Sequence, residues 1–258
     1  MNQLEHTDHH YALVGEKLSH SFSKAYFDAK FANSKSDGYS YRLLELDSLA
    51  GLRQKVQELQ LDGFNVTIPY KEQMLHMLDE VDPTAAAIGA VNTVKVIRHD
   101  NQLMLIGYNT DAPAFLETLR PLLRDWHHKA LILGTGGASK AVAWALRQLG
   151  IAHRFVSRTP LKHVGQGIDT VAYDEAFQLA DSHLLIVNCT PVGMYPHIEE
   201  SPWKTPAVLT PKHLCYDLIY NPERTRFLLD ATERGAATAN GLAMLHRQAD
   251  MAYTIWQA

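Results

Sequence analysis

Apolar and polar positions follow two different periods over the first 110 residues. Short apolar runs are typical of strands, and the segments between them repeat apolar residues every three or four positions, as one face of a helix does. Asp82-Pro83 matches the N-cap and first position of a helix. The pattern predicts strands at 11–14, 41–46, 64–68, 91–97 and 103–106, the last two forming a hairpin, and helices at 24–31 and around 49–59.

From Pro113 onward, helices and strands are expected to alternate along the chain. Apolar runs at 131–133, 155–156, 184–187 and 216–219 are separated by helical or irregular segments, and 242–256 has helical periodicity. Strands separated by helices indicate right-handed βαβ units and a parallel sheet. We therefore expect an α/β protein of two domains, with the ligand site in the cleft between them.

A glycine-rich loop follows the apolar run 131–133. Gly134-Thr135-Gly136-Gly137-Ala138-Ser139 leads into an alanine-rich helical pattern, which predicts strand, tight turn and helix. That geometry brings backbone N–H groups and a helix N-terminus against a pyrophosphate. Because Ser139 stands where the usual fingerprint has a third glycine, the loop alone is also compatible with an ordinary strand-to-helix turn.

The end of the next apolar run distinguishes between two dinucleotides. Arg158 follows Gly136 by 22 residues, where a domain selective for NAD would place Asp or Glu on the ribose 2′-hydroxyl. Ser157 and Thr159 flank it, and Lys162 comes shortly after. Cations and hydroxyls suit a 2′-phosphate, so the pattern favours NADP over NAD.

Composition narrows the class of partner. With 258 residues, of which 46% are hydrophobic, the chain can bury a substantial core. A net charge of −4 without basic clusters argues against nucleic acid and anionic membranes as partners. No apolar run reaches the roughly 18 residues of a membrane span, and the N-terminus lacks a basic-then-apolar export signal, so we expect a cytoplasmic protein.

Cysteines and histidines add little chemistry. Cys189 and Cys215 lie in or beside apolar runs and are expected to be buried thiols in a reducing compartment. The 14 histidines include clusters at His6, His9 and His10 and at His127-His128. No array of ligands with metal spacing accompanies them. We expect solvated surface histidines and assign no metal.

Four polar clusters fall at the ends of expected strands, where open α/β sheets bind ligands. Hydroxyl, amide and carboxylate groups with one lysine suit the orientation and protonation of a small polyhydroxylated alcohol or ketone. Local turn chemistry, and capping of the next helix by Ser21 or Ser23, explain the same residues equally well. The clusters are Ser19–Ser23, Asn65–Lys71, Gly89–Thr93 and Gly107–Asp111.

Taken in order, nine motifs resemble the shikimate dehydrogenase family, from Val14 nearly to the C-terminus. They are Ser19-His20-Ser21-Phe22-Ser23, Asn65-Val66-Thr67-Ile68-Pro69-Tyr70-Lys71, Gly89-Ala90-Val91-Asn92-Thr93, Asn109-Thr110-Asp111, Gly134-Thr135-Gly136-Gly137-Ala138-Ser139, Ser157-Arg158-Thr159, Asn188-Cys189-Thr190-Pro191-Val192-Gly193-Met194, Asp217-Leu218-Ile219-Tyr220 and Gly241-Leu242-Ala243-Met244-Leu245-His246-Arg247-Gln248. Departures are Glu16-Lys17-Leu18, Lys24 in place of proline, and Ser157 in place of asparagine before the cofactor arginine.

The resemblance implies a substrate-binding domain at 1–111, completed by 240–258 with the C-terminal helix, and a Rossmann-like NADP-binding domain at 112–239. It implies Lys71 and Asp111 as the catalytic pair. The implied substrate contacts are Ser21, Ser23, Thr67, Lys71, Asn92, Asp111, Tyr220 and Gln248. The implied NADP contacts are Gly134, Gly136, Gly137, Ala138, Ser157, Arg158, Thr159, Lys162, Met194 and Gly241.

The implied activity is the reversible, NADP-dependent reduction of 3-dehydroshikimate to shikimate, by a monomer or homodimer. Two alternatives stay open at this point. One is a quinate/shikimate dehydrogenase that uses NAD, against which Arg158 counts. The other is a non-catalytic nucleotide or metabolite sensor on the same fold, against which the presence of Lys71 and Asp111 counts.

Overall fold

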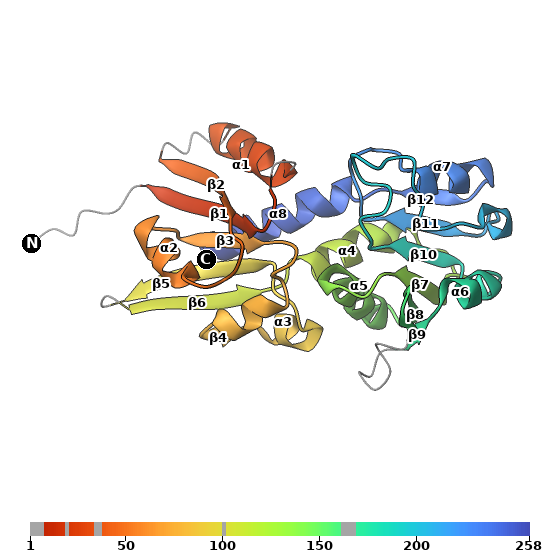
Figure 1. Cartoon of the computed structure of the whole chain (residues 1–258), viewed down its shortest axis with the longest axis horizontal. Coiled ribbons are helices and arrows are strands. Elements are labelled where there is room, and N and C mark those ends of the chain that lie inside the picture. The colour runs from red at the N-terminus through yellow and green to blue at the C-terminus, as the bar shows by residue number, and fades with distance from the viewer. Residues whose placement is uncertain (1–7, 19–20, 34–37, 100–101, 161–168) are drawn as a thin grey trace, which may run out of the picture. The chain divides into compact units, whose positions relative to one another are not determined.

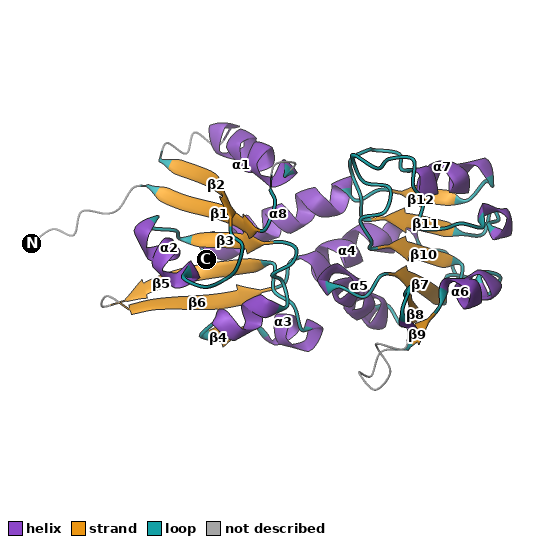
Figure 2. Cartoon of the chain, viewed as in Figure 1, coloured by secondary structure: helices purple, strands orange, loops and turns teal. Residues whose placement is uncertain are grey.

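A computed structural model of the chain describes residues 8–18, 21–33, 38–99, 102–160 and 169–258. The chain forms two compact units, one of Met1–Thr110 with Gln248–Ala258 and one of Asp111–Arg247. Each unit is a sheet covered by helices (Figures 1 and 2). The unit boundaries fall after residues 110 and 247, whereas the family resemblance implies boundaries after 111 and 239.

The first unit has a mixed sheet of six strands in the order β2-β1-β3-β5-β6-β4. Strand β1 pairs in parallel with β2 and β3, β5 pairs antiparallel with β3 and β6, and β4 pairs in parallel with β6. The strands are β1 (His9–Gly15), β2 (Tyr39–Glu45), β3 (Gly63–Val66), β4 (Glu80–Val81), β5 (Thr93–His99) and β6 (Gln102–Tyr108). The expected hairpin is confirmed, whereas the third strand ends at Val66, two residues earlier than predicted.

Helices bury both faces of this sheet. They are α1 (Phe22–Asn33), α2 (Leu52–Glu58), α3 (Pro83–Ile88) with the short helix η1 (Gln73–Met77), and α8 (Leu242–Gln257), whose C-terminal part, from Gln248 on, belongs to this unit. Because side chains alternate along a strand, Tyr11 and Leu13 pack with α1 and α8, and Ala12 and Val14 pack with α2 and α3. Asp82 caps α3 through Thr84 N and Ala85 N, as predicted.

Trp256 anchors the end of α8 on the N-terminal sheet. Its ring stacks on Tyr11 with centroids 4.4 Å apart, and its Nε1–H donates to Val94 O at 3.0 Å. A Cβ on Gly63 would overlap the indole, so glycine is required where the ring rests on β3. The contact brings α8 onto strands that lie far before it in the sequence.

The second unit has a six-stranded sheet in the order β12-β11-β10-β7-β8-β9, with every pair parallel. The strands are β7 (Lys129–Leu133), β8 (Ala152–Val156), β9 (Thr170–Val171), β10 (Leu185–Asn188), β11 (Leu214–Asp217) and β12 (Ala237–Ala239). Around them lie α4 (Asp111–Leu119), α5 (Gly137–Gln148), α6 (Tyr173–Leu179), α7 (Arg226–Glu233), η2 (Arg120–Leu122) and η4 (Pro206–Val208). This confirms the expected parallel α/β fold, with continuous apolar runs in its central strands.

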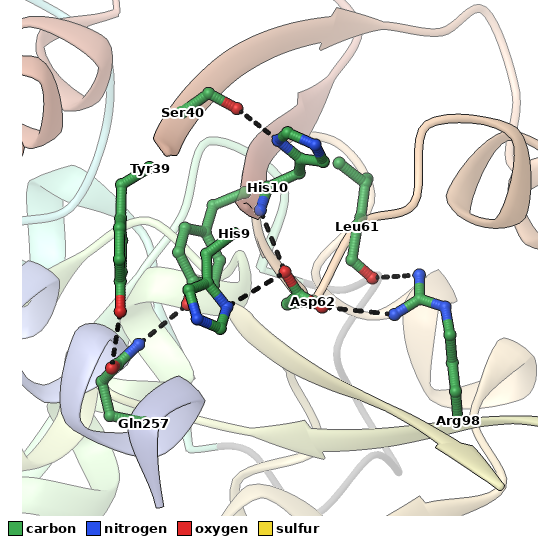
Figure 3. Close-up of polar contacts among 9 residues, drawn as sticks. His9, His10, Tyr39, Ser40, Leu61, Asp62, Arg98 and Gln257 are labelled. Carbon is green, nitrogen blue, oxygen red and sulfur yellow. Dashed lines mark hydrogen bonds and ion pairs between the residues drawn. The ribbon is translucent and has the colours of Figure 1, made fainter. Parts of the chain in front are cut away.

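The histidines are less exposed than predicted. His127, expected at the surface, is 5% exposed because its ring fills the space between Arg124 N and Lys212 O. His9 and His10 are half-buried against Asp62 and Ser40 (Figure 3). His128 is exposed as predicted, and His6 lies outside the described residues.

Both cysteines are free. Cys215 is buried, as predicted, and Cys189 is half-buried. Burial raises the pKa of both thiols well above its usual range. Within the described part of the chain, no helix is long and apolar enough to cross a membrane, and no group of three or more His, Cys, Asp or Glu residues could hold a metal ion.

Candidate active site

A network of neutral polar side chains lies in the first unit. It forms where the segment before β5 meets the part of α8 that belongs to this unit, which starts at Gln248. Asn92 Oδ1 accepts from Thr110 N at 2.7 Å, and Asn92 Nδ2 donates to Thr110 Oγ1 at 2.9 Å. Gln248 Oε1 accepts from both Asn92 Nδ2 at 3.4 Å and Thr110 Oγ1 at 3.5 Å. The fold thus brings together Asn92 and Gln248, two predicted site residues that are far apart in the sequence.

Asn65 extends this network through its own hydrogen bonds. It is 5% exposed on β3 and donates from Nδ2 to Asn92 O at 3.3 Å and to Thr93 Oγ1 at 3.2 Å. Its Oδ1 accepts from Tyr41 Oη at 2.8 Å. Burial raises the pKa of Tyr41 well above its usual range, and a hydrogen bond with Ser23 opposes that shift. A chain of hydrogen bonds therefore links Ser23 to Asn92.

Ser21 has the capping role that the sequence left open. It immediately precedes α1, and its Oγ accepts from Ser23 N at 3.3 Å. Its own N–H donates to Leu18 O at 2.9 Å. A capping hydroxyl still carries a proton that it can donate, so the cap is compatible with ligand binding. Ser19 and His20 lie outside the described residues.

Thr67 and Lys71 follow β3 on a segment fixed by backbone hydrogen bonds. Thr67 N donates to Val14 O at 2.9 Å, and Val91 N donates to Lys71 O at 2.8 Å. Both residues are half-buried. Asp111 is the first residue of α4 and of the second unit, and is 6% exposed. A carboxylate in the first turn is stabilised by the helix dipole.

The glycine-rich loop forms the predicted turn between β7 and α5. Gly134 has a φ of +106°, which favours glycine, and a Cβ there would lie 3.2 Å from Thr190 Cγ2 and 3.3 Å from Ser139 Oγ. Gly136 is the N-cap of α5, with no side-chain cap hydrogen bond. A Cβ on Gly136 would meet nothing within 4 Å. The loop therefore presents an open backbone at a helix N-terminus, which fits a pyrophosphate.

Arg158 lies on the turn after β8 and is exposed. Ser157 N donates to Val171 O at 3.0 Å, and Thr159 N donates to Ser157 Oγ at 3.2 Å, which fixes the turn. Burial raises the pKa of Tyr173, and the nearby charge of Arg158 opposes that rise. Gly134 N donates to Val156 O at 2.9 Å, so the glycine loop and the Arg158 turn start side by side. Lys162 lies outside the described residues.

Met194, Tyr220 and Gly241 lie on three separate segments of the second unit. Met194 is 46% exposed, and Tyr220 is half-buried. A Cβ on Gly241 would overlap Leu218 O, and Gly241 N donates to Ile219 O at 3.1 Å. Any side chain at position 241 would therefore push this segment away from residues 218–220.

Some polar residues of these networks were missing from the predicted site. Thr110, Asn65 and Thr93 lie within the motifs, but the resemblance implies no role for them. Asn188, Asp217 and Thr225 are all 0% exposed in the second unit. A usable signal was present for two of them, because Asn188 and Asp217 each interrupt an apolar run at the end of a strand.

The second unit is a parallel α/β fold with a glycine turn and a basic turn beside it, and the first unit contains a polar side-chain network. Together these features are typical of a dinucleotide-dependent α/β enzyme. A family model described as "Shikimate dehydrogenase substrate binding domain" matches residues 13–94. The NADP(+) shikimate dehydrogenase of Carboxydothermus hydrogenoformans is 38% identical over 257 residues, covering 95% of this chain and 90% of the relative. The chain belongs to the shikimate dehydrogenase family, which confirms the resemblance.

Solved structures of similar proteins have the same fold as this chain. Shikimate 5-dehydrogenase from Thermus thermophilus, in complex with NADP(H) and shikimate, has a TM-score of 0.82 and 34% identity, covering 96% of this chain and 93% of that one. Quinate dehydrogenase from Corynebacterium glutamicum, in complex with NAD, has a TM-score of 0.83 and 26% identity, with coverage of 96% and 93%. The fold is therefore shared by enzymes that differ in substrate and in cofactor.

Proposed function

We propose that this protein is an NADP-dependent shikimate dehydrogenase, which interconverts 3-dehydroshikimate and shikimate in aromatic amino acid biosynthesis. The observation that carries the proposal is the family membership across 95% of the chain. The network at Asn92 and Gln248 and the glycine loop with Arg158 supply the two kinds of site that this reaction needs. We further propose a cytoplasmic monomer or homodimer.

In this proposal, the first unit holds the substrate. A polyhydroxylated carboxylate needs several donors and acceptors in fixed positions, because each unpaired polar group costs binding free energy. Asn92 and Gln248 are held by mutual hydrogen bonds, so they lose little side-chain entropy on binding. The proposed contacts are Ser21, Ser23, Thr67, Lys71, Asn92 and Gln248 from this unit, with Asp111 and Tyr220 from the second.

The second unit would hold NADP. The backbone at Gly134, Gly136, Gly137 and Ala138 suits the pyrophosphate, since it combines N–H donors with an open approach. Arg158 suits the 2′-phosphate, with Ser157, Thr159 and Lys162 beside it in sequence. Met194 and Gly241 would line the nicotinamide. When bound, this cofactor supplies the hydride or accepts it.

Lys71 and Asp111 would do the acid–base chemistry. Lys71 either donates a proton to the substrate oxygen as the ketone becomes an alcohol, or stays charged and stabilises the developing alkoxide. Asp111 would fix the position of that oxygen and of the ammonium. In the reverse direction the same groups would take up the hydroxyl proton.

One observation favours a second candidate. The similarity to quinate dehydrogenase from Corynebacterium glutamicum, with NAD bound, makes a broader quinate/shikimate dehydrogenase the alternative. Arg158 argues against it, because NAD would leave the guanidinium without an anion.

A coupled absorbance assay tests the proposal with shikimate and quinate, each with NADP and with NAD. We expect turnover with shikimate and NADP that exceeds the other three combinations, and loss of that turnover in Lys71→Ala. Equal use of NAD, or faster turnover of quinate, would favour the alternative. No turnover with any pair would contradict both.

A further inference from the structure

Asp217 is a buried carboxylate to which the proposed mechanism gives no role. It is 0% exposed at the end of β11. Its Oδ1 accepts from Asn188 Nδ2 and from Ile219 N, both at 3.0 Å, and its Oδ2 accepts from Thr225 Oγ1 at 2.6 Å. The three donors come from the end of β10, from the loop after β11 and from the N-cap of α7.

Asn188 extends this arrangement into the loop after β10. It pairs with Asp217 in the parallel register of β10 and β11. Its Oδ1 accepts from Thr190 N at 3.0 Å and from Thr190 Oγ1 at 2.7 Å, and its Nδ2 also donates to Val192 O at 3.5 Å. The orientation of the Asn188 amide, and with it the path of residues 189–192, therefore depends on the carboxylate.

The segments that meet at Asp217 carry Met194 and Gly241, which are implied to contact NADP, and Tyr220, which is implied to contact the substrate. Met194 ends the loop whose start is held by Asn188. Tyr220 follows Ile219, whose N–H bonds Asp217 and whose carbonyl accepts from Gly241 N. A Cβ on Gly193, where φ is +95°, would lie 3.7 Å from Thr225 Cβ, so the third donor lies beside the Met194 loop.

We propose that Asp217 is a positioning residue for the nicotinamide end of the cofactor, because it fixes together the loops that carry Met194, Tyr220 and Gly241. This role rests on the proposed function. A carboxylate in this place is costly to bury, because a buried charge loses its hydration and needs hydrogen bonds in its place. The buried carboxylate lies at the point where three loops must keep their positions relative to one another.

The electrostatics agree with an ionised group at neutral pH. Burial raises the pKa of Asp217 to about 6, and its hydrogen bonds with Thr225, Ile219 and Asn188 oppose the rise. At pH 7.5 the carboxylate is therefore mostly charged and accepts from all three donors.

The test compares Asp217→Asn and Thr225→Val with two controls. Asp217→Asn keeps the shape but replaces one acceptor oxygen by an N–H donor, and Thr225→Val removes the donor to Oδ2. Thr225→Ser keeps that hydroxyl. Asp230→Asn changes a carboxylate that is 8% exposed in the same unit and pairs with Arg226 on the same helix.

Four quantities are measured at pH 7.5: kcat and KM for NADP with shikimate, the Kd of adenosine 2′,5′-bisphosphate, and the midpoint of thermal unfolding. The bisphosphate carries the 2′-phosphate but no nicotinamide. We expect kcat/KM for NADP to fall by about 10- to 100-fold in Asp217→Asn and Thr225→Val, because a nicotinamide that is held out of position reacts more slowly. The Kd of the bisphosphate should stay within about twofold, and Thr225→Ser and Asp230→Asn should resemble wild type.

Two results would overturn the inference while leaving the proposed function intact. One is wild-type kinetics in both Asp217→Asn and Thr225→Val. The other is a loss of bisphosphate affinity in proportion to the loss in NADP kinetics, which would indicate general damage to the unit. Wild-type protein without shikimate-dependent turnover would instead overturn the proposed function, and this role with it.

Discussion

The two units present different groups to a ligand. In the first, the predicted contacts are side chains held by one another, as in the hydrogen bonds among Asn92, Thr110 and Gln248. In the second, the glycine loop presents backbone at the start of α5, and Arg158 lies exposed on a turn. Side-chain networks suit a small molecule with many distinct hydroxyls, whereas backbone N–H groups and one guanidinium suit phosphates.

The units also differ in the buried groups that change charge near or below neutral pH. Among the described residues, the buried polar side chains of the first unit are Asn65, Asn92, Thr93, Asn109 and Thr110, all neutral. The second unit buries three histidines and three carboxylates: His127, His183, His213, Asp111, Asp217 and Asp230. Protonation should therefore affect the second unit more than the first.

Lys71→Ala should have the largest effect on activity. We expect kcat with shikimate to fall by about 10²–10⁴-fold, the range for a positioned acid–base group, with a much smaller change in KM. Steady-state kinetics at saturating NADP measure it. A variant that keeps more than half of the wild-type kcat would remove Lys71 from the mechanism.

Gly136→Ala tests backbone recognition in the second unit. The φ of Gly136 is −80°, and a Cβ there meets nothing, so the unfolding midpoint should not change. The methyl group would occupy the space expected for the pyrophosphate, and losing even one or two charge-assisted hydrogen bonds weakens binding by roughly 10²-fold. NADP titration monitored by calorimetry provides the Kd. Unchanged affinity would exclude this loop as the pyrophosphate site.

Arg158→Ala tests the choice of cofactor. A charge-assisted contact contributes roughly 1.5–3 kcal/mol, so wild type should prefer NADP over NAD by about 10- to 100-fold in kcat/KM. The variant should lose most of that preference through weaker NADP binding, with little change for NAD. If wild type uses both cofactors equally, the interpretation of Ser157-Arg158-Thr159 is wrong.

Gln248→Ala should have a smaller effect, confined to the substrate. A neutral hydrogen bond contributes about 0.5–1.5 kcal/mol, so KM for shikimate should rise roughly 3- to 10-fold. Thr254→Ala, at a position on the same helix whose hydroxyl bonds Asp250 O at 3.1 Å, is the matched control. Equal changes in the two variants would indicate damage to α8 and not a lost contact.

Acid should weaken the second unit slightly more than the first. Burial lowers the pKa of His127, His183 and His213, so below about pH 6.5 the unfolded chain binds protons that the folded one resists, and stability falls. Asp217 has the opposite sign, because its raised pKa adds stability as the pH falls from about 6 to 4. Limited proteolysis at pH 7.5 and 5.5 should show extra cleavage first within 111–247. Cleavage appearing first in the other unit would contradict this.

Sequence patterns predicted local features of the fold well and long-range ones poorly. The turn at Gly134 and the cap at Asp82 depend on neighbouring residues, so their chemistry is readable directly. The burial of His127 depends on Lys212, and the role of Asp217 depends on Asn188 and Thr225. Such contacts are made only when segments that are separate in the sequence become neighbours in the fold. For the same reason, Gln248 joined the predicted site through family resemblance and not through spacing.

The central claim is that Gln248 of the first unit recognises the substrate and Arg158 of the second recognises the cofactor, and paired binding measurements test it most directly. Calorimetry would measure the Kd of shikimate and of adenosine 2′,5′-bisphosphate for wild type, Gln248→Ala and Arg158→Ala. We predict that Gln248→Ala weakens only shikimate and that Arg158→Ala weakens only the bisphosphate. Weakening of both ligands by either variant, with its unfolding midpoint unchanged, would contradict the claim.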